Sequence, residues 1–399
     1  MLCAALGIER SDSNCKTKSQ VQRANGKGLK MAKKTPNRTL AKARDAKQDE
    51  FYTQLADISD ELKHYRTQLR GKVILCNCDD PFESNFFKYF ALNFNALGLK
   101  KLIATSYLRS PIVGADLPLF AIEGLKPEGK EPYAVEINEV PDQNSDGAID
   151  LADVEYLLKH NANSARTLEG DEFYSGGDFR SRECVELLKQ SDIVITNPPW
   201  SLFREFVTQL VAHDKQFLIV ANQNAISYAE IFKLIEGNKL WLGNKSGDMA
   251  FQVPDYYEAR ETRFWVDEHG KKWRSMGNAC WFTNMDLAKR HEELPLYKKY
   301  NPDSYPTYVN YDAIEVGRVS DIPKDYKGAM GVPITFLAKY NPDQFEIIGA
   351  SHALGRPMHK FAKRGTYTNR GGGSFYLPNG DGTYRCLYDR IVIRKKVAR

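Results

Sequence analysis

Short apolar runs alternate with segments of helical spacing through the middle of this 399-residue chain. The apolar runs are residues 72–76, 101–105, 192–196 and 216–220. Residues 86–97 and 203–211 lie between them and repeat apolar side chains every three or four positions. Short, continuously apolar runs are typical of strands that are buried on both faces. Because strands that alternate with helices form mainly parallel sheets, the pattern predicts an α/β fold with helices on both faces of the sheet.

The two ends of the chain differ from this middle part. Residues 1–48 are basic and polar and lack apolar periodicity, which predicts a disordered segment. Met31 offers a second translation start within it. Beyond about residue 240, Trp, Tyr, Gly and Pro become frequent and strand-like pieces replace the alternation, with a hairpin tip expected at residues 267–271. We therefore expect one domain at 49–244 and a less regular α+β region at 245–399.

The charge is concentrated near the two ends, although the formal net charge is only +5. Residues 16–47 contain eleven Lys or Arg and a single acid, Asp45. Residues 356–399 contain eleven more, against Asp381 and Asp389. A run of charge is often only a solvated face, but basic side chains also bind phosphates and release counterions. The charge distribution therefore favours nucleic acid as the partner.

Hydropathy and cysteine spacing favour a cytoplasmic protein. No apolar run in the sequence approaches the roughly 20 residues that a membrane-spanning helix needs. The apolar start at residues 1–8 is followed at once by charge, unlike a signal peptide. The seven cysteines are scattered, and even Cys76 and Cys78 have the spacing of neither a zinc knuckle nor a thioredoxin motif. We expect reduced thiols with packing roles.

A motif whose residue types suit a catalytic site directly follows the apolar run at 192–196. It consists of Asn197, Pro198, Pro199 and Trp200. Consecutive prolines fix φ and remove two N–H donors, so the nearby acceptors are held rigidly. The amino group of adenine needs acceptors for two N–H bonds, and the Asn197 side-chain oxygen and the Pro198 carbonyl can supply them. Trp200 offers a face on which a flipped base can stack. A proline-rich turn without chemistry is the alternative, and we predict that these four residues are catalytic.

These four residues match the Asp/Asn/Ser-Pro-Pro-aromatic signature of amino-methyltransferases, and the resemblance extends further. The chain resembles the EcoRI-type adenine-specific DNA methyltransferases from residue 31 to residue 349, apart from one insertion at about 127–170. The segments that carry the resemblance are DEFYTQ (49–54), CNCDDP (76–81), SNFFKYF (84–90), GDFR (177–180), NPPWSLFRE (197–205), GAMGVPITFL (328–337) and YNPDQFEII (340–348).

The resemblance implies an S-adenosylmethionine-dependent N6-adenine methyltransferase of the gamma arrangement that acts on a flipped-out adenine in double-stranded DNA. Residues 49–244 would form the catalytic domain, a Rossmann-like methyltransferase sheet, and residues 245–399 the target-recognition region. The expected setting is the cytoplasm of a bacterium, or a phage-encoded protein there, with a monomer favoured. The target sequence and the existence of a partner restriction nuclease stay open.

The resemblance also implies a cofactor site. Phe51, Tyr52 and Thr53 match the motif that packs beside the methionine end of the cofactor. The residues where the first strand turns over the cofactor would be Asn77, Cys78, Asp79, Asp80 and Pro81. Asp178 and Phe179 match the third-strand motif, whose acid meets the adenine amino group of the cofactor and whose aromatic side chain abuts the adenine ring.

This cofactor site departs from the pattern of many methyltransferases. There is no Gly-rich turn after the first strand, and Thr105, Ser106 and Tyr107 stand where an acid would bind the ribose hydroxyls. For Asp79 and Asp80 the alternative is a solvated turn. For Asp178 it is the N-cap of a helix.

The insertion carries a second motif, with the spacing of a calcium-binding loop. Oxygen ligands stand at positions 1, 3, 5, 9 and 12, and Gly147 stands at position 6. The candidate ligands are Asp142, Asn144, Asp146, Asp150 and Asp153. Position 12 is Asp rather than the Glu of an EF-hand, and Pro141 leaves no entering helix. Calcium binding is one interpretation, and an Asx-rich turn that caps a helix is the other.

The C-terminal part is expected to contact DNA through basic side chains interleaved with aromatic ones, at residues 260–274 and 360–370. Trp265 and Trp273 suit stacking or a buried core equally. Three alternatives to DNA methylation stay open at this point: methylation of RNA adenine, methylation of protein glutamine, and a catalytically silent DNA-binding protein of the same fold. The basic ends argue against a protein substrate, and the intact motif at 197–200 argues against a silent protein.

Overall fold

The fold is described from a computed structural model, in which the chain divides into two units, Met1–Arg38 and Thr39–Arg399. The structure describes residues 53–78, 81, 84–107, 132–143, 145, 147, 149–150, 153–154, 156–157, 165–253, 257–368 and 373–396. All of these belong to the second unit. The expected disorder of residues 1–48 therefore lies outside the described residues.

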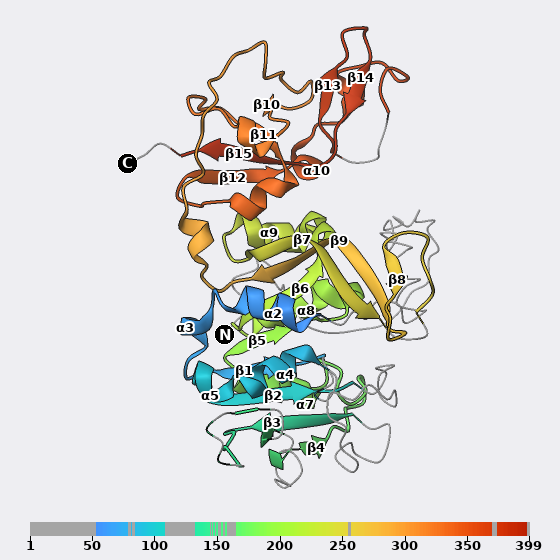
Figure 1. The fold of residues 1–399 in the computed structure, drawn as a ribbon. Helices are drawn as coiled ribbons and strands as arrows, with labels where there is room; N and C mark the ends of the chain where they lie inside the picture. The colour runs from blue at the N-terminus through green and yellow to red at the C-terminus, as the bar shows by residue number, and fades with distance from the viewer. Residues whose placement is uncertain are drawn as a thin grey trace, which may run out of the picture. The chain divides into compact units, whose positions relative to one another are not determined.

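A nine-stranded mixed sheet forms the centre of the described part of the chain, in the order β4-β3-β2-β1-β5-β6-β9-β7, with β8 paired to β9 (Figure 1). Its first six strands are β1 (Val73–Cys76), β2 (Lys101–Thr105), β3 (Tyr133–Ile137), β4 (Ala165–Thr167), β5 (Ile193–Thr196) and β6 (Gln216–Asn222). The last three are β7 (Trp241–Val253), β8 (Phe264–Val266) and β9 (Lys272–Thr283). Strands β2, β1, β5 and β6 are parallel, and β3 and β9 join this group in the antiparallel sense.

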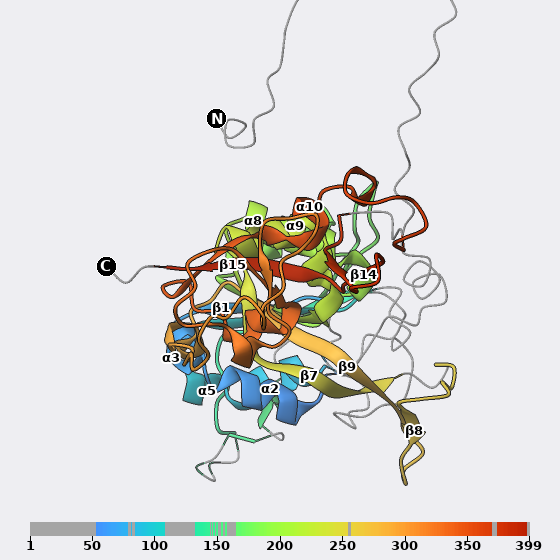
Figure 2. The same ribbon diagram turned by 90° about the horizontal axis from the view of Figure 1, so that it is seen from above.

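Helices alternate with the parallel strands, as the sequence pattern predicts, and two further helices precede β1. They are α2 (Leu55–Leu62), α3 (Arg66–Leu69), α4 (Asn85–Leu92), α5 (Phe94–Leu97), α7 (Arg182–Gln190), α8 (Phe203–Ala212) and α9 (Ala229–Glu236). Ser84 and Ser181 start α4 and α7, because each hydroxyl accepts backbone N–H bonds from the first turn. Gly98, at φ 61°, ends α5 in the left-handed conformation. Figure 2 shows α2 and α5 on one side of β1 and α8 on the other.

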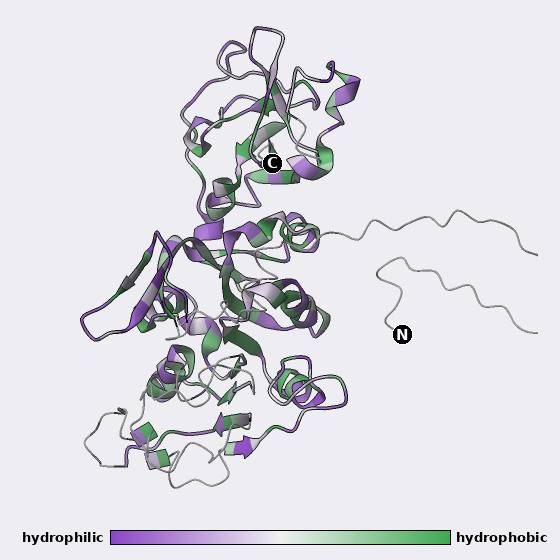
Figure 3. Ribbon diagram, turned by 90° about the vertical axis from the view of Figure 1, so that its right-hand side faces the viewer, coloured by the Kyte–Doolittle hydropathy of each residue, from purple (hydrophilic) through white to green (hydrophobic). Residues whose placement is uncertain are grey.

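Burial explains why these strands can be recognised from sequence. Every residue of β1 and β5 is buried, and so are the central residues of β2 and β6. The four predicted strands agree with the observed ones to within two residues, and the hairpin tip expected at 267–271 connects β8 to β9. Figure 3 shows the hydrophobic colour concentrated on the strands inside the protein, whereas the ribbon that projects from the central sheet is mostly hydrophilic.

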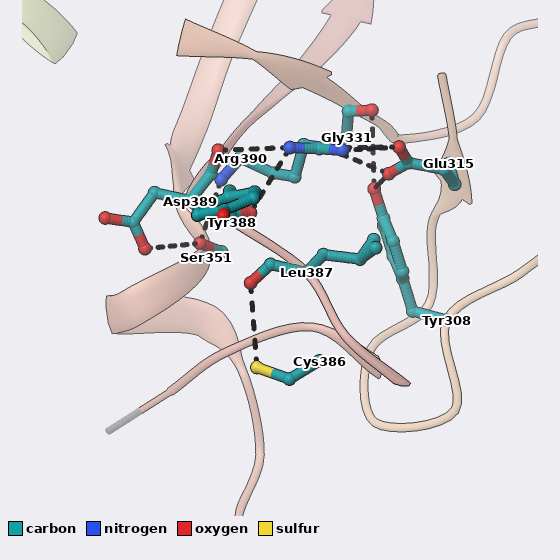
Figure 4. Close-up of polar contacts among 9 residues, drawn as sticks. All are labelled: Tyr308, Glu315, Gly331, Ser351, Cys386, Leu387, Tyr388, Asp389 and Arg390. Atoms are coloured by element: carbon teal, nitrogen blue, oxygen red, sulfur yellow. Dashed lines mark hydrogen bonds and ion pairs between the residues drawn. The ribbon is translucent and has the colours of Figure 1, made fainter. Parts of the chain in front are cut away.

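A second, four-stranded sheet follows, in the order β10-β11-β15-β12. Its strands are β10 (Ile314–Glu315), β11 (Met330–Pro333), β12 (Phe345–Ala350) and β15 (Arg390–Lys395). Glu315 and Arg390 form a buried ion pair at 2.8 Å between β10 and β15, and the Tyr308 hydroxyl also binds Glu315 (Figure 4). The partnered carboxylate offsets the cost of burying the guanidinium, so the pair fixes these strands in one arrangement.

The boundary expected at 244/245 falls within β7, a strand of the central sheet. Most of β7, and all of β8 and β9, therefore lie in the predicted recognition region and yet belong to the central sheet. The second sheet begins with β10. Among the residues that the structure describes, no helix is long and apolar enough to span a membrane.

Candidate active site

The candidate site lies at the carboxyl ends of the parallel strands. The chain continues from β1 to β2 on one side, whereas β5 pairs with β1 on the other side. In an open α/β sheet, ligands bind at such a reversal of strand order, beyond the carboxyl ends of the strands. The residues that end or follow these strands are Asn77, Thr105 and Asn197. The topology therefore brings three of the segments singled out in the sequence to one edge.

The predicted catalytic motif begins where β5 ends. Thr196, the last residue of β5, donates its hydroxyl hydrogen bond to the backbone carbonyl of Asn77, and this contact joins the ends of β5 and β1. Pro199 is extended, with φ −55° and ψ 119°, and precedes the short 3₁₀-helix η1 (Trp200–Leu202). Among the described residues, none donates a hydrogen bond to the Pro198 carbonyl. The motif thus retains the backbone acceptor that the sequence predicted.

Trp200 fixes the side chain of Asn197. Its indole Nε1 donates a hydrogen bond to Asn197 Oδ1 at 2.9 Å. The indole is only 6% exposed, and it packs edge-on against Phe251 of β7, with ring centroids 5.8 Å apart. Trp200 was expected to offer a stacking face, but in this structure the ring is buried and its polar edge orients the Asn197 amide.

The turn after β1 is tight and partly described. Cys78 adopts a positive φ of 66°, which an L-residue adopts only in a sharp turn. Asn77 is 2% exposed, and its side-chain oxygen has no hydrogen-bond partner among the described residues. Pro81 is buried, whereas Asp79 and Asp80 lie outside the described residues. Their predicted contact with the cofactor therefore stays a prediction.

Thr53 is the described residue of the predicted N-terminal motif, since Phe51 and Tyr52 lie outside the described residues. Its backbone carbonyl accepts a hydrogen bond from Asn85 Nδ2 at 2.9 Å, which attaches the motif to the first residue of α4. The Thr53 hydroxyl is buried, and no described residue forms a hydrogen bond with it. Because α4 follows the β1 turn, this contact places Thr53 beside the same edge of the sheet.

The end of β2 carries hydroxyl groups in place of the missing acid. The Ser106 hydroxyl accepts from the Tyr133 amide at 2.9 Å, so it serves the pairing of β2 with β3. The Thr105 hydroxyl is buried and has no partner within the described part of the chain. Gly177, at φ 75°, lies so close to Ser106 that a Cβ atom would stand 1.9 Å from the Ser106 carbonyl oxygen. This close approach brings the motif at 177–180 against the end of β2.

Asp178 is held by Arg180 in a two-bonded ion pair. Arg180 Nε donates to Asp178 Oδ1 at 2.9 Å, and Nη2 donates to Oδ2 at 2.8 Å. Oδ1 also accepts the Arg180 amide at 3.0 Å. A carboxylate has about four acceptor positions, so one position on Oδ2 stays available. Asp178 does not cap α7, because Ser181 occupies that position, and the Phe179 ring packs against Phe206 of α8 at 5.0 Å.

The role of Arg180 was not foreseen from the sequence. Its Nη1 also donates to Glu205 on α8 at 2.8 Å, and its guanidinium lies over the rings of Tyr174 and Phe179. The two carboxylates raise the pKa of Arg180 and keep it charged. Arg180 therefore connects the motif at 177–180 to the helix that follows the catalytic motif. The only local signal was its position two residues after Asp178.

The structure gives the predicted calcium loop no support. Asp142 Oδ2 accepts the Gly147 amide at 2.8 Å, and Asp153 accepts the amides of Gln143 and Asp150 at 2.8 and 2.9 Å. Asn144 and Asp146 lie outside the described residues. Among the residues that are described, no group of three or more His, Cys, Asp or Glu side chains is placed to hold a metal ion. The carboxylates of Asp142 and Asp153 instead bind backbone amides, as the alternative of an Asx-rich turn requires.

Comparison with known proteins identifies the family. The chain is 47% identical over 326 residues to the Type II methyltransferase M.EcoRI of Escherichia coli, a match that covers 80% of this chain and 90% of that protein. It is 38% identical over 313 residues to the Type II methyltransferase M.MpnI of Mycoplasma pneumoniae, covering 77% and 84% of the two chains. No solved structure matches. The family model "Adenine-specific methyltransferase EcoRI" matches residues 39–396, and the chain therefore belongs to the EcoRI family of adenine-specific methyltransferases.

Proposed function

We propose that the protein methylates N6 of adenine at specific sites in double-stranded DNA, with the motif at 197–200 as its catalytic centre. The observation that carries this proposal is the placement of Asn197 at the carboxyl end of β5, where Trp200 orients its amide oxygen. The family membership supplies the adenine specificity and implies S-adenosylmethionine as the methyl donor. The names of M.EcoRI and M.MpnI as Type II methyltransferases support DNA as the substrate.

The residues at this edge of the sheet fit S-adenosylmethionine. Buried polar atoms without a partner cost free energy, so a cluster of them indicates a ligand. Three such atoms belong to the segments expected to surround the cofactor: Thr53 Oγ1, Asn77 Oδ1 and Thr105 Oγ1. We propose that they bind the hydroxyl and amino groups of the cofactor, with Thr105 in place of the usual ribose-binding acid. The remaining acceptor position of Asp178 suits the adenine amino group.

The chain's own contribution to the reaction is alignment and electrostatics. S-adenosylmethionine supplies a methyl group that its sulfonium already activates. Asn197 Oδ1 and the Pro198 carbonyl would accept the two N–H bonds of the target amino group and hold its lone pair in line with the methyl carbon. Both acceptors would also stabilise the positive charge that develops on N6 in the transition state. Alignment of this kind contributes about 7–11 kcal/mol in favourable cases.

The adenine has to leave the duplex before these acceptors can reach its amino group. The position of the motif at the carboxyl edge of the sheet and the basic C-terminal region support a flipped-out base bound at the motif and a duplex held by residues 245–399. The burial of Trp200 means that stacking of the base on its indole would require the ring to turn away from Phe251. We therefore propose that the first role of Trp200 is to orient Asn197.

Transfer of a labelled methyl group tests this function. The purified protein is incubated with labelled S-adenosylmethionine and with plasmid DNA, total RNA or a protein mixture. We expect label in duplex DNA as N6-methyladenine, and no label in RNA or protein. The Asn197→Ala variant should lose transfer and retain DNA binding. Near-normal turnover by Asn197→Ala would overturn the assignment of the catalytic centre, and label in RNA or protein alone would overturn the substrate. Single-molecule sequencing of DNA from an expressing host would then reveal the target motif.

A further inference from the structure

A stretch of the C-terminal region lacks acidic residues altogether. Residues 347–380 contain no Asp or Glu, and four cationic side chains lie close together within them: Arg356, Lys360, Lys363 and Arg364. All four are exposed. Among the residues that the structure describes, none forms a salt bridge or a hydrogen bond with the cationic groups of these four side chains. We call residues 356–368 the basic loop, and its positive charge is not neutralised within the described part of the protein.

The basic loop is attached at both ends to neighbouring segments of the C-terminal region, through Asn310 and Tyr376. Asn310, 1% exposed, donates two hydrogen bonds, to the carbonyls of Arg356 at 2.8 Å and Ser374 at 2.7 Å. Its own side-chain oxygen accepts the Tyr376 amide at 3.2 Å. At the other end, the Tyr376 hydroxyl donates to the Thr368 carbonyl at 2.9 Å. One buried amide therefore joins the start of the loop to the segment that follows it.

Within the basic loop one apolar side chain is buried, whereas the four cations and one phenylalanine are exposed. Met358, which opens the 3₁₀-helix η6 (Met358–Lys360), is 5% exposed and anchors the loop to the protein. Phe361, directly after η6, is 39% exposed. An exposed aromatic side chain among unpaired cations is a combination that nucleic-acid surfaces use for contacts with the backbone and the bases. Because the ends of the loop are anchored, binding would cost mainly the rotamer freedom of these exposed side chains.

Other cations of the C-terminal region are engaged within the protein. Arg390 is neutralised by Glu315 (Figure 4). On the ribbon of β7, β8 and β9, Arg263 pairs with Asp248, and Lys272 donates to the Tyr257 carbonyl. Residues 257–274 also carry four acids against five cations. The sequence alone led us to expect DNA contacts from both the ribbon and residues 360–370, and the unpaired cations make the basic loop the stronger candidate of the two.

We propose that the basic loop binds the phosphate backbone of the duplex DNA substrate, independently of base sequence. Unpaired Lys and Arg side chains that neutralise phosphates release counterions, which gives affinity that falls steeply with salt. Such contacts position the protein on the duplex, whereas base-edge contacts elsewhere would set the target sequence. This inference rests on the proposed function, which identifies duplex DNA as the bound polyanion. It assigns phosphate binding to a surface other than the candidate catalytic site.

The double variant Lys360→Gln/Lys363→Gln tests the inference against a matched control, Lys298→Gln/Lys299→Gln. The control lysines are exposed as well, but they follow the acids Glu292 and Glu293. Binding of the full-length proteins to a fluorescent duplex of arbitrary sequence is measured by anisotropy at several salt concentrations. We expect the loop variant to reduce the slope of log affinity against log salt by about 2, and the affinity at 0.1 M salt on the order of 50-fold. The control variant should resemble the wild type.

The outcomes separate this inference from the proposed function. Affinity within twofold of the wild type and an unchanged slope in the loop variant overturn the inference, even if the wild type methylates DNA. An equal loss in the control variant overturns it as well, because the effect would then follow net charge alone. If the wild type binds duplex DNA with the expected loss in the loop variant but methylates none, the proposed function fails and the inference stands. Thermal unfolding of each variant confirms that the fold is intact.

Discussion

The indole Nε1 of Trp200 donates a hydrogen bond to Oδ1 of Asn197, over 2.9 Å. The two residues are three positions apart, and the prolines between them make the loop stiff enough to maintain this contact. The amide oxygen that would receive the substrate amino group is thus oriented before DNA binds. An acceptor that is already oriented costs no reorganisation when the reaction begins.

Replacement of Trp200 by Phe removes the indole donor and preserves an aromatic ring. We expect kcat to fall about 2- to 10-fold, the loss that corresponds to one hydrogen bond of about 0.5–1.5 kcal/mol. The dissociation constants for DNA and S-adenosylmethionine should stay within twofold of the wild type. Single-turnover methylation measures the chemical step directly.

The matched control for this variant is Phe251→Leu, which removes the ring that packs against Trp200 and leaves the indole donor in place. Its kcat should exceed that of Trp200→Phe. An equal loss in both variants would show that packing of the indole, rather than its hydrogen bond, matters for the reaction.

Arg180 offers a second test, on the cofactor side of the site. Its ion pair with Asp178 orients the carboxylate expected to bind the adenine of the cofactor. Hydrogen bonds to charged groups contribute about 1.5–3 kcal/mol, so Arg180→Gln should weaken S-adenosylmethionine binding about 10- to 100-fold. Isothermal titration with S-adenosylmethionine gives this constant, and the affinity for DNA should not change.

The comparison variant for Arg180 is Glu205→Gln, which removes the charge at the other end of the guanidinium and leaves the Asp178 pair intact. We expect its cofactor affinity to stay within threefold of the wild type. Normal cofactor binding by Arg180→Gln would count against a role for the ion pair in positioning Asp178.

The sequence was sufficient to predict the parallel strands β1, β2, β5 and β6, because strands buried on both faces carry continuous apolar runs. Strand β3 was not predicted, although four of its five residues are buried, since it lies within a segment treated as an insertion. Its backbone pairs with β2, and the Ser106 hydroxyl adds a contact to the Tyr133 amide from 27 positions away. Local periodicity carries no information about such a contact.

The candidate site likewise combines a motif of consecutive residues with contacts between residues that are far apart in the sequence. The Asn197 motif could be located, because its chemistry lies in four consecutive residues. The burial of Trp200 could not, because Phe251, which packs against it, lies about fifty positions further along the chain. The contact between Arg180 and Glu205 likewise spans 25 positions. Which cations are available to bind DNA also depends on distant contacts. Arg390 pairs with Glu315, 75 positions away, whereas the lysines of the basic loop have no acidic partner among the described residues.

Gly177 allows a test of how the motif at 177–180 is placed. A Cβ atom there would stand 1.9 Å from the Ser106 carbonyl oxygen, and φ is 75°, which an L-residue rarely adopts. We expect Gly177→Ala to lower the free energy of unfolding by more than about 2 kcal/mol and to weaken cofactor binding. Gly270→Ala has a similar φ of 76° but no atom within 4 Å of the new Cβ, so it isolates the cost of the backbone conformation. Urea denaturation of both variants measures the difference, and equal losses would exclude the steric contact as the cause.

Glu61 predicts a pH dependence of stability. This α2 carboxylate is fully buried and accepts the Tyr65 hydroxyl at 3.0 Å and the amides of Asn244 and Lys245 at 2.6 and 2.7 Å. Burial raises the pKa of Glu61 above its ordinary value of 4.5, although the two amide hydrogen bonds act in the opposite direction. The folded protein therefore binds this proton more tightly than the unfolded chain does. The stabilisation that results is fully present below pH 4.5 and is lost as the pH rises through the raised pKa.

Glu61→Gln removes this titration and retains a side-chain acceptor for the β7 amides. Relative to this variant, the wild type should lose up to about 1.4 kcal/mol per pH unit between pH 4.5 and the raised pKa, and nothing further above it. Urea denaturation at half-unit steps from pH 4.5 to pH 7 measures both profiles. Glu186→Gln, at an exposed position paired with Lys189, is the control and should run parallel to the wild type. Parallel profiles for the wild type and Glu61→Gln would mean that the folded carboxylate titrates as it does in the unfolded chain, and that the hydrogen bonds from β7 and Tyr65 fully offset its burial.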